Sequence, residues 1–382
     1  MSINVIDFVF LNLAFTVTFT GVIINNYEKY VPAFIIKGYR YGCFAYQGSD
    51  ANFLQVIEIP KSYYRHFYLF SSLFSVASLF YMISVYFFGT SVNFYVHFLL
   101  KLLLQEDEPS LSVSAALLAM SLLTVQCLRR LYETYCLQVF AKSSKMNLSH
   151  YLAGIIHYFA CIVAIIGQAP LLCGLQNRHT MSWNDTRTTI LAIPCSLVFF
   201  YACYEQYRAN VIFANLRRDK KSGEVVTEDH RIPHGRLFEV VSSPHRMCEI
   251  VIYTTLIMLV PTKTFLCIYL WVLGNQIQTA IQAHQWYKKT FDNYPTNRYL
   301  MCYRIGNEEI CRRTRVTDIA HRIAKLMWQW EHSISRLPTW LRSPESDGCR
   351  WLRPSWKSLR DAYGRYYSIV FDPVKVKARR GQ

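Results

Sequence analysis

The sequence contains few charged residues. Asp, Glu, Lys and Arg account for 17% of its 382 residues, whereas hydrophobic residues account for 52%. Because a soluble domain usually carries about 25% charged residues, one compact water-soluble body is excluded. Aromatic residues reach 15%, a share that excludes a disordered chain as well. The composition therefore predicts a folded protein that lies in a membrane.

Common motifs for nucleotide and metal binding are also absent from the sequence. It contains neither G-x-G-x-x-G nor G-x-x-x-x-G-K-S/T, so a bound nucleotide would use neither a Rossmann domain nor a P-loop. The 12 cysteines form no C-x-x-C pair and no Cys/His pattern with the spacing of metal ligands. We therefore expect no metal site, and we expect cysteines that pack as small hydrophobic residues.

Seven stretches of the chain are apolar enough, or nearly so, to cross a bilayer as a helix, which takes about 20 residues. The sixth stretch is short and stops at Pro261. The sequence thus predicts an all-α integral membrane protein with about seven transmembrane helices. The expected spans are 5–24, 67–88, 111–128, 151–173, 189–204, 248–262 and 264–283.

Basic residues are distributed unevenly among the connections between these spans. The odd-numbered connections contain 17 Lys and Arg residues, and the even-numbered connections contain four. Because basic connections stay in the cytosol, we expect the amino terminus on the lumenal side and the carboxy-terminal tail in the cytosol. The net charge of +16 suits an anionic membrane face or a nucleic acid.

Three groups of ionisable residues lie where the chain meets the membrane, and their cost there makes them functional candidates. The first begins at Glu58, just before the second span. In the second, Gln126, Arg130 and Glu133 would share one helical face. The third is the connection 205–249, where Arg and Lys can clamp phosphates and Asn, His and Tyr can contact ribose or amide groups. An interfacial helix and a solvated loop would also explain these residues.

The order of these residues resembles the steroid 5-alpha-reductase family. The chain carries E-I-P-K-x-Y-x-x-H-F-Y at 58–68, R-R-L-Y-E at 129–133, H-R-I-P-x-G at 230–235 and H-Q-W-Y-K-x-x-F-x-x-Y-P-x-x-R at 284–298. Each motif alone is weak, but together they occur in the family's order between the family's spans. The first two motifs and His230 are more similar to the polyprenol reductase branch than to the steroid branches.

The resemblance implies an enzyme of the endoplasmic reticulum membrane that uses NADPH and takes a lipid substrate from the bilayer. It implies reduction of the alpha-isoprene double bond of a polyprenoid, on the route to dolichol and protein N-glycosylation. Glu58 matches the acid near the polar end of the substrate. The steroid branches place a second polarising tyrosine where this chain has Cys127, so Tyr132 becomes the candidate for that role.

The same resemblance implies a set of cofactor-binding residues. Two of them depart from the family pattern, since His245 stands where the family often has Asn, and Asn210 stands where it has His or Asp. The candidate NADPH-binding residues are Arg130, Gln206, Asn210, Arg217, His230, Arg231, His245, Glu249, His284 and Tyr287.

The chemistry of hydride transfer constrains the form of the substrate. An allylic alcohol is a poor hydride acceptor, because the resulting carbanion is not delocalised. An alpha,beta-unsaturated aldehyde accepts hydride at its beta carbon and places the charge on oxygen, where a protonated Glu58 carboxyl would stabilise it. We therefore favour polyprenal over polyprenol as the species reduced. A 3-oxo-5-alpha-steroid reductase and a non-enzymatic seven-span receptor stay open as alternatives.

The last part of the chain differs in composition from the expected reductase domain, 1–300. Residues 301–382 contain 17 Lys and Arg against 8 Asp and Glu. The run 313–330 has helical periodicity and resembles the region that follows the polymerase in reverse transcriptases of non-LTR retrotransposons, which implies a fusion. Such a basic, aromatic tail suits nucleic acid or anionic lipid headgroups, and we expect no obligate nucleic-acid partner.

Overall fold

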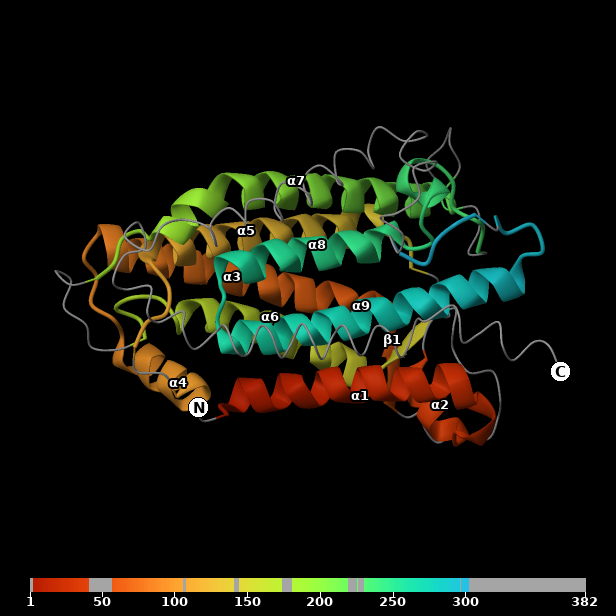
Figure 1. Cartoon of the computed structure of the whole chain (residues 1–382), viewed down its shortest axis with the longest axis horizontal. Helices are drawn as coiled ribbons and strands as arrows, with labels where there is room; N and C mark the ends of the chain where they lie inside the picture. Colours follow the sequence, from red (N-terminus) through yellow and green to blue (C-terminus); the bar gives the residue numbers. More distant parts are fainter. Residues whose placement is uncertain are drawn as a thin grey trace, which may run out of the picture. The chain divides into compact units, whose positions relative to one another are not determined.

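Helices make up nearly all of the regular structure in the computed structural model, and the predicted all-α membrane fold is confirmed (Figure 1). In chain order, the elements are α1 (Val5–Tyr27), η1 (Glu28–Tyr30), α2 (Ala33–Tyr39), β1 (Glu58–Pro60), η4 (Lys61–Tyr63), α3 (Tyr64–Phe87), α4 (Phe94–Leu104), α5 (Val113–Tyr132), η5 (Glu133–Leu137), β2 (Lys145–Asn147), α6 (Leu148–Ile166), α7 (Thr186–Asn215), η6 (Arg236–Glu239), α8 (Pro244–Leu259) and α9 (Lys263–Thr290).

The described residues belong to one unit of the chain, Met1–Tyr303. The expected basic tail lies outside the described residues from residue 302 onward, so its separation from the reductase domain stays a prediction. The structure describes residues 3–40, 57–105, 108–140, 144–173, 181–218, 225, 230–295 and 297–301.

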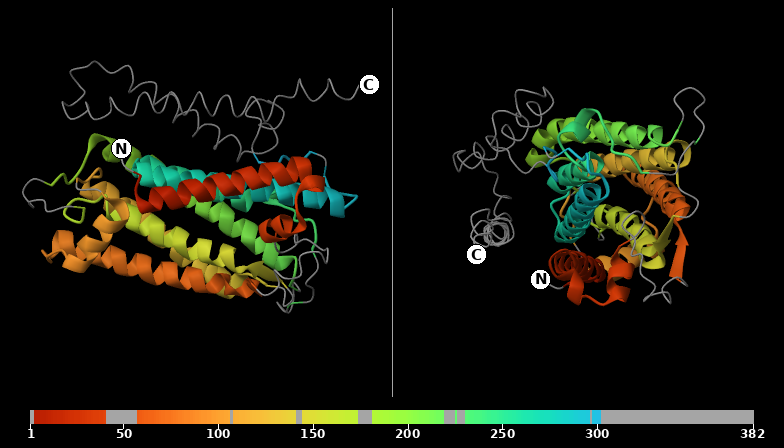
Figure 2. Two further views of the ribbon diagram at one scale, coloured as in Figure 1. Left: turned by 90° about the horizontal axis from the view of Figure 1, so that it is seen from below. Right: turned by 90° about the vertical axis from the view of Figure 1, so that its right-hand side faces the viewer.

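Within the described residues, seven helices lie side by side along one direction, and consecutive members run in opposite directions (Figure 1). They are α1, α3, α5, α6, α7, α8 and α9. The most extensive contacts join α7 to α8, α1 to α9, and α3 to α5 and α6. Figure 2 shows α1 lying against α9 from two further directions. Helix α8 runs back along α7, and α9 reverses direction once more. As a result, α9 ends at the end of the bundle opposite to the start of α1.

Six of the seven helices are long and apolar enough to cross a membrane. The exception is α8, which has 16 residues, so the sixth expected span is the one that falls short. Large hydrophobic side chains such as Phe15, Phe80 and Leu197 point outward, each more than half exposed. An outward apolar surface over long helices is the arrangement that lipid requires, and the protein is a multi-pass membrane protein.

Two helix boundaries differ from the hydropathy prediction. Helix α6 ends at Ile166 instead of 173, because Gly167 and Pro170 follow, and proline disfavours a helical residue before it. Helix α7 continues to Asn215 instead of stopping at 204. Glu205, Gln206 and Asn210 in its last three turns are buried and have partners, so this part of the chain is not the solvated connection that its polarity predicts.

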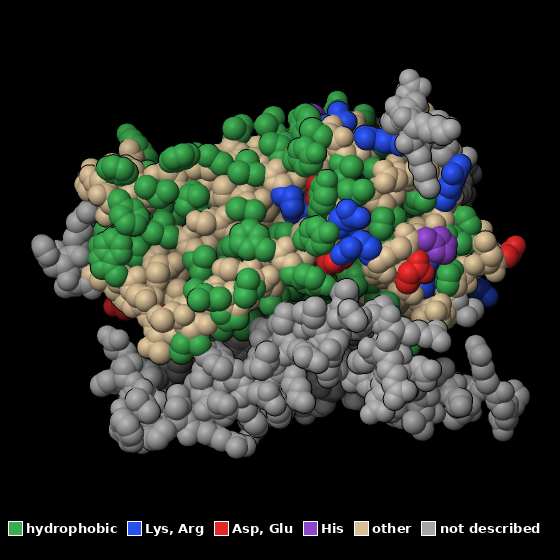
Figure 3. Space-filling view, turned by 90° about the horizontal axis from the view of Figure 1, so that it is seen from above, with side chains coloured by type: hydrophobic (Ala, Val, Ile, Leu, Met, Phe, Trp, Pro, Cys, Tyr) green, Lys and Arg blue, Asp and Glu red, His purple; other side chains and the backbone are tan. Residues whose placement is uncertain are grey.

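The odd-numbered connections meet at one end of the bundle, where α9 also finishes (Figure 1). We call it the basic end. Here β1 and β2 pair antiparallel, with Glu58 opposite Asn147, and so join the first and third connections. Figure 3 shows hydrophobic side chains over most of one face, with Lys, Arg and His in the half toward the basic end. The predicted gathering of basic connections at one end is therefore present.

An ion pair between a buried carboxylate and a half-buried lysine joins α1 to α9 at the opposite end. Asp7, which is 1% exposed, lies 2.6 Å from Lys263 Nζ and accepts a hydrogen bond from Thr264 Oγ1 at 2.7 Å. Further along the same contact, a Cβ atom at Gly274 would lie 2.6 Å from Thr18 Oγ1. Small residues allow this close approach, as is usual between helices in membranes.

Candidate active site

A buried carboxylate, Glu133, follows α5 near the basic end. Its side chain is 0% exposed. It begins η5, a single π-helical turn, and such turns are rare and frequent at functional sites. One carboxylate oxygen pairs with Arg129 and the other with Arg130, while Asn210 Nδ2 donates to the second oxygen at 2.9 Å. Two guanidinium groups and an amide thus compensate the buried charge.

A second carboxylate, Glu249 in α8, extends this network. Its Oε2 accepts hydrogen bonds from Gln126 Nε2 at 3.2 Å and from Gln206 Nε2 at 2.5 Å. Gln206 Nε2 also donates to the His245 carbonyl oxygen at 2.8 Å, and Gln206 Oε1 accepts from Arg129. The network joins α5, η5, α7 and α8. We call it the polar cluster, and it consists of Gln126, Arg129, Arg130, Glu133, Gln206, Asn210 and Glu249.

The helical spacing of the sequence accounts for this cluster. Gln126 bonds to Arg129, and Glu133 pairs with both Arg129 and Arg130, which are the contacts expected between residues three and four apart on a helix. Gln206 and Asn210 are one turn apart on α7 and face the same side. The structure therefore brings together four of the candidate cofactor residues, namely Arg130, Gln206, Asn210 and Glu249.

Tyr68 in α3 adjoins the polar cluster and was not among the sequence-based candidates. Its hydroxyl oxygen accepts hydrogen bonds from Arg130 Nε at 3.3 Å and from Nη2 at 3.1 Å. The guanidinium carbon also lies 5.0 Å from the centre of the Tyr68 ring. On the other side, the ring of Tyr158 meets it at 5.7 Å. The side chain is half-buried and held from two directions.

A second group of candidates lies at the rim of the basic end. Arg217 Nη1 donates to the Val139 carbonyl oxygen at 2.8 Å, and its Nη2 is 3.4 Å from His230 Nε2. The His230 ring meets the Trp286 ring edge to face at 5.1 Å. Tyr287, in the last turn of α9, is 9% exposed. The carboxy-terminal ends of α7 and α9 therefore bound this rim, together with the segment that begins at His230.

His284 connects α9 to the chain just before α8. Its Nδ1 lies 2.5 Å from Ser242 Oγ, which also accepts a hydrogen bond from Tyr294 OH at 2.7 Å. The Tyr287 and Tyr294 rings stack at 5.4 Å. These contacts fix the two candidates His284 and Tyr287 against the start of α8, while His245 reaches the polar cluster through its backbone carbonyl.

The three remaining candidates also lie apart from the polar cluster. Glu58 is in β1 and has Lys145 Nζ at 3.9 Å, and no contact among the described residues joins it to the cluster. Tyr132 is 54% exposed, since it points away from the face that carries Arg130. Arg231 is exposed at the rim. The structure does not unite Glu58 and Tyr132 in one site, and Tyr68 is the phenol that lies beside Arg130.

Buried polar atoms without a hydrogen-bond partner gather near the start of α8. They are Ser243 Oγ, His245 Nδ1, Arg246 Nε, and Nε and Nη1 of Arg298. A buried polar group without a partner costs about 1–3 kcal/mol. Ser243 precedes the first turn of α8, and a helix amino terminus favours anions. These groups fit a ligand that carries phosphates, such as NADPH.

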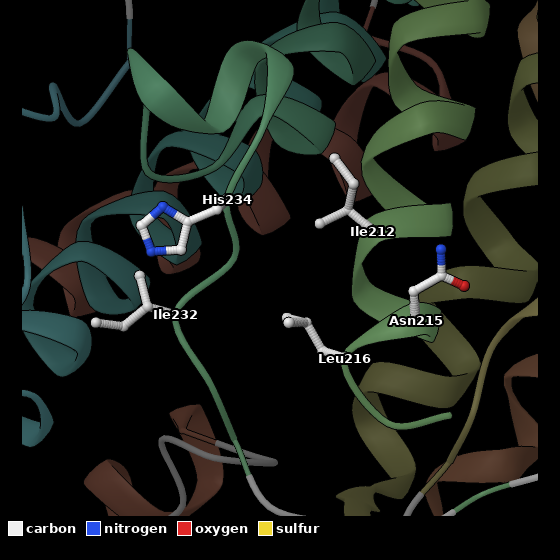
Figure 4. Close-up of a pocket in the computed structure, with 5 residues that line it drawn as sticks. All are labelled: Ile212, Asn215, Leu216, Ile232 and His234. Carbon is white, nitrogen blue, oxygen red and sulfur yellow. The ribbon is translucent and has the colours of Figure 1, made fainter. Parts of the chain in front are cut away.

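A cavity of about 270 Å³ opens at the same end of the bundle (Figure 4). Ile212, Asn215 and Leu216 at the end of α7 line one side, and Ile232 and His234 line the other. Three apolar side chains with one amide and one imidazole suit a flat heterocyclic ring that also forms hydrogen bonds.

One further ion pair lies at this rim. Glu205, one position before the cluster residue Gln206, is 3% exposed and pairs with Arg236. The hydrogen-bonded Glu205 carboxylate raises the pKa of Arg236. In the part of the chain that the structure describes, no group of three His, Cys, Asp or Glu residues could hold a metal ion.

Comparisons with known proteins agree with this architecture. The family model of the 3-oxo-5-alpha-steroid 4-dehydrogenases matches residues 171–305, which include α7, α8 and α9. A polyprenal reductase of Drosophila melanogaster is 34% identical over 300 residues, which cover 78% of this chain and 91% of that protein. A polyprenal reductase of Caenorhabditis elegans is 31% identical over 300 residues, which cover 75% of this chain and 91% of that protein.

The human polyprenal reductase is similar to this chain as well, with 30% identity over 254 residues, which cover 64% of this chain and 77% of that protein. These alignments, of up to 300 residues, span far more of the chain than any single motif does. The chain belongs to the steroid 5-alpha-reductase family, together with the animal polyprenal reductases.

Proposed function

We propose that the protein reduces the alpha-isoprene double bond of a polyprenoid lipid, on the route to dolichol, with NADPH as its cofactor. The observation that carries this proposal is the polar cluster, in which the buried carboxylate of Glu133, a second carboxylate and two arginines gather near one end of a bundle with an apolar exterior. Relatives of similar sequence are polyprenal reductases. A receptor needs no such cluster, and the family membership excludes that alternative.

NADPH would supply the hydride when bound, and the chain's own residues would hold it. Ser243 and Arg246 at the start of α8, with Arg298 nearby, offer unpaired polar atoms for phosphates. Arg217 and Arg231 at the rim offer guanidinium groups, which bind phosphate oxygens in pairs. The cavity beside Leu216 suits the adenine ring. In this arrangement Gln206, Asn210 and Glu249 would contact the nicotinamide end, deeper in the bundle.

The substrate would reach the site from the bilayer. A polyprenoid is as apolar as lipid, and the outer faces of α1, α3 and α7 carry large hydrophobic side chains. Only its oxygen-bearing end needs polar partners, so that end would lie at the cluster. A 3-oxo-4-ene steroid presents the same conjugated carbonyl, and the description of the matching family model makes it the second candidate substrate.

Substitution of the rim arginines should weaken NADPH use. Arg217→Ala or Arg231→Ala should raise the KM for NADPH at least tenfold, because a charge-assisted contact to phosphate contributes about 1.5–3 kcal/mol. Steady-state kinetics with purified protein and polyprenal would measure this change. Arg218→Ala is the matched control, since Arg218 also donates to backbone carbonyls of η5, at 3.1 and 3.3 Å. An unchanged KM in both rim variants would refute the assignment.

We also propose that the basic end faces the cytosol and that the protein lies in the endoplasmic reticulum membrane. An N-x-T glycosylation cassette inserted between residues 106 and 107 should then receive a glycan, because that connection joins the opposite end. The same cassette between residues 226 and 227 should remain unmodified. Gel mobility before and after endoglycosidase treatment would distinguish the two. A glycan only on the second insertion would reverse the orientation.

A further inference from the structure

The hydrogen bonds of Tyr68 leave its own proton without an acceptor. Both donations from Arg130 end on the phenolic oxygen, at 3.3 and 3.1 Å, so the two lone pairs of that oxygen are engaged. The O–H group must therefore point away from Arg130. Within the described ranges, no side chain or carbonyl group accepts a hydrogen bond from it. A substrate oxygen in front of this O–H group would accept its hydrogen bond.

Arg130 differs from Tyr68, because each of its three guanidinium nitrogens already donates a hydrogen bond. One edge pairs with Glu133, and the other edge donates to Tyr68. The side chain is 13% exposed. These bonds leave Arg130 few N–H groups for direct contact with NADPH, whose binding is the role that the family resemblance implies for it. The Arg130 guanidinium is placed to orient the Tyr68 phenol and to stabilise negative charge on a group that is hydrogen-bonded to that phenol.

From these contacts we infer that Tyr68 is a catalytic residue which donates a hydrogen bond to the carbonyl oxygen of the substrate, and that Arg130 is a positioning residue that acts through Tyr68. The inference rests on the proposed function, since it requires a conjugated carbonyl substrate. It assigns the donor role to Tyr68 in place of Tyr132, which points away from the cluster.

The substrate gains a hydride first and a proton second. The hydride forms a new C–H bond at the beta carbon, and the electron pair of the C=C bond moves into the bond between the alpha carbon and the carbonyl carbon. The C=O pair moves onto oxygen, giving an enolate that accepts the Tyr68 hydrogen bond. The electron pair between the alpha carbon and the carbonyl carbon then takes a proton from water, which leaves as hydroxide, and the oxygen pair restores the C=O bond. Tyr68 leaves the step unchanged.

Removing the hydroxyl tests this role. Tyr68→Phe should lower kcat about 100-fold, the scale of one oxyanion donor, with little change in the KM for NADPH. Tyr158→Phe is the matched control, because Tyr158 is a buried phenol that touches the Tyr68 ring and is not bonded to Arg130. That variant should keep its turnover within about threefold, since the donor role would be untouched.

Two further variants test whether Tyr68 itself is the donor. Glu58→Leu should lower kcat less than Tyr68→Phe does; the reverse order would assign the donor role to Glu58. Arg130→Lys keeps the charge but cannot place two N–H groups on one phenolic oxygen, so kcat should fall about tenfold, less than when the donor itself is lost. Should Tyr68→Phe fail to fold, a normal kcat for Arg130→Lys would overturn the proposal, and the expected decrease would support it.

Binding of an enolate mimic gives a readout that does not depend on turnover. Geranylgeranoic acid carries a carboxylate at the end of an isoprenoid chain, and Tyr68→Phe should raise its Kd at least tenfold, because the variant loses a charge-assisted hydrogen bond. The Kd of NADPH should not change. Equal Kd values for both proteins, or full turnover by Tyr68→Phe, would overturn the role of Tyr68 alone. A wild-type protein that reduces no conjugated carbonyl would overturn the proposed function and this inference together.

Discussion

Glu133→Leu is expected to lower the midpoint of thermal unfolding in detergent by roughly 10 °C, because removing one partner of a buried ion pair costs about 3–5 kcal/mol. Glu133 is 0% exposed and compensates both Arg129 and Arg130. Without it, two adjacent guanidinium groups would lie near the membrane interior with no carboxylate on that side. Reductase activity should be lost as well, since Arg130 would no longer hold Tyr68.

The matched control is Glu28→Leu, which makes the same change in an exposed pair. Glu28 is 51% exposed and lies 2.7 Å from Arg40 Nη1. Exposed pairs contribute about 0–1 kcal/mol, so this variant should unfold almost as the wild type does. Glu133→Gln keeps hydrogen-bond capacity without the charge and should be intermediate. Equal midpoints for Glu133→Leu and the wild type would contradict a central role for this carboxylate.

The helices could be predicted from the sequence because lipid imposes a simple rule. Every span must satisfy its backbone polar groups internally and present apolar side chains outward, so hydropathy marks the spans. The same rule explains the error in α7. Glu205, Gln206 and Asn210 have the polarity of a solvated connection, and only tertiary packing shows that they face Arg236, Glu249 and Glu133 within the bundle.

The polar cluster could be predicted in part. Spacing on one helix indicated that Gln126, Arg130 and Glu133 share a face, because residues three and four apart are neighbours. Motif order then suggested Gln206, Asn210 and Glu249, but the contacts among them depend on how α5, α7 and α8 pack. No pattern within a single helix specifies that packing, and the structure was needed to connect them.

Tyr68 could not be assigned from the sequence for a related reason. Tyr63, Tyr64 and Tyr68 lie within six residues at the start of α3, a pattern that also suits rings at the membrane surface. Which hydroxyl meets Arg130 depends on how α3 packs on α5. Glu58 shows the same limit, since its pairing opposite Asn147 in a short sheet has no signal in an otherwise helical chain.

The largest difference in rate is expected between polyprenal and polyprenol as substrates. Polyprenal should be reduced with a kcat/KM roughly 1,000-fold or more above that of polyprenol, because only the aldehyde delocalises the added charge onto oxygen and each tenfold corresponds to about 1.4 kcal/mol. A 3-oxo-4-ene steroid has the same conjugated carbonyl but a rigid ring system, so it should be reduced less efficiently than the flexible isoprenoid.

The most direct test is NADPH oxidation by the purified protein with polyprenal, polyprenol and a 3-oxo-4-ene steroid offered in parallel, with the lipid products identified by mass spectrometry. We expect NADPH consumption with polyprenal, accompanied by saturation of its alpha-isoprene unit, and little consumption with the other two. Efficient reduction of polyprenol, a preference for the steroid, or no NADPH oxidation with any of the three would contradict a conjugated polyprenoid aldehyde as the substrate.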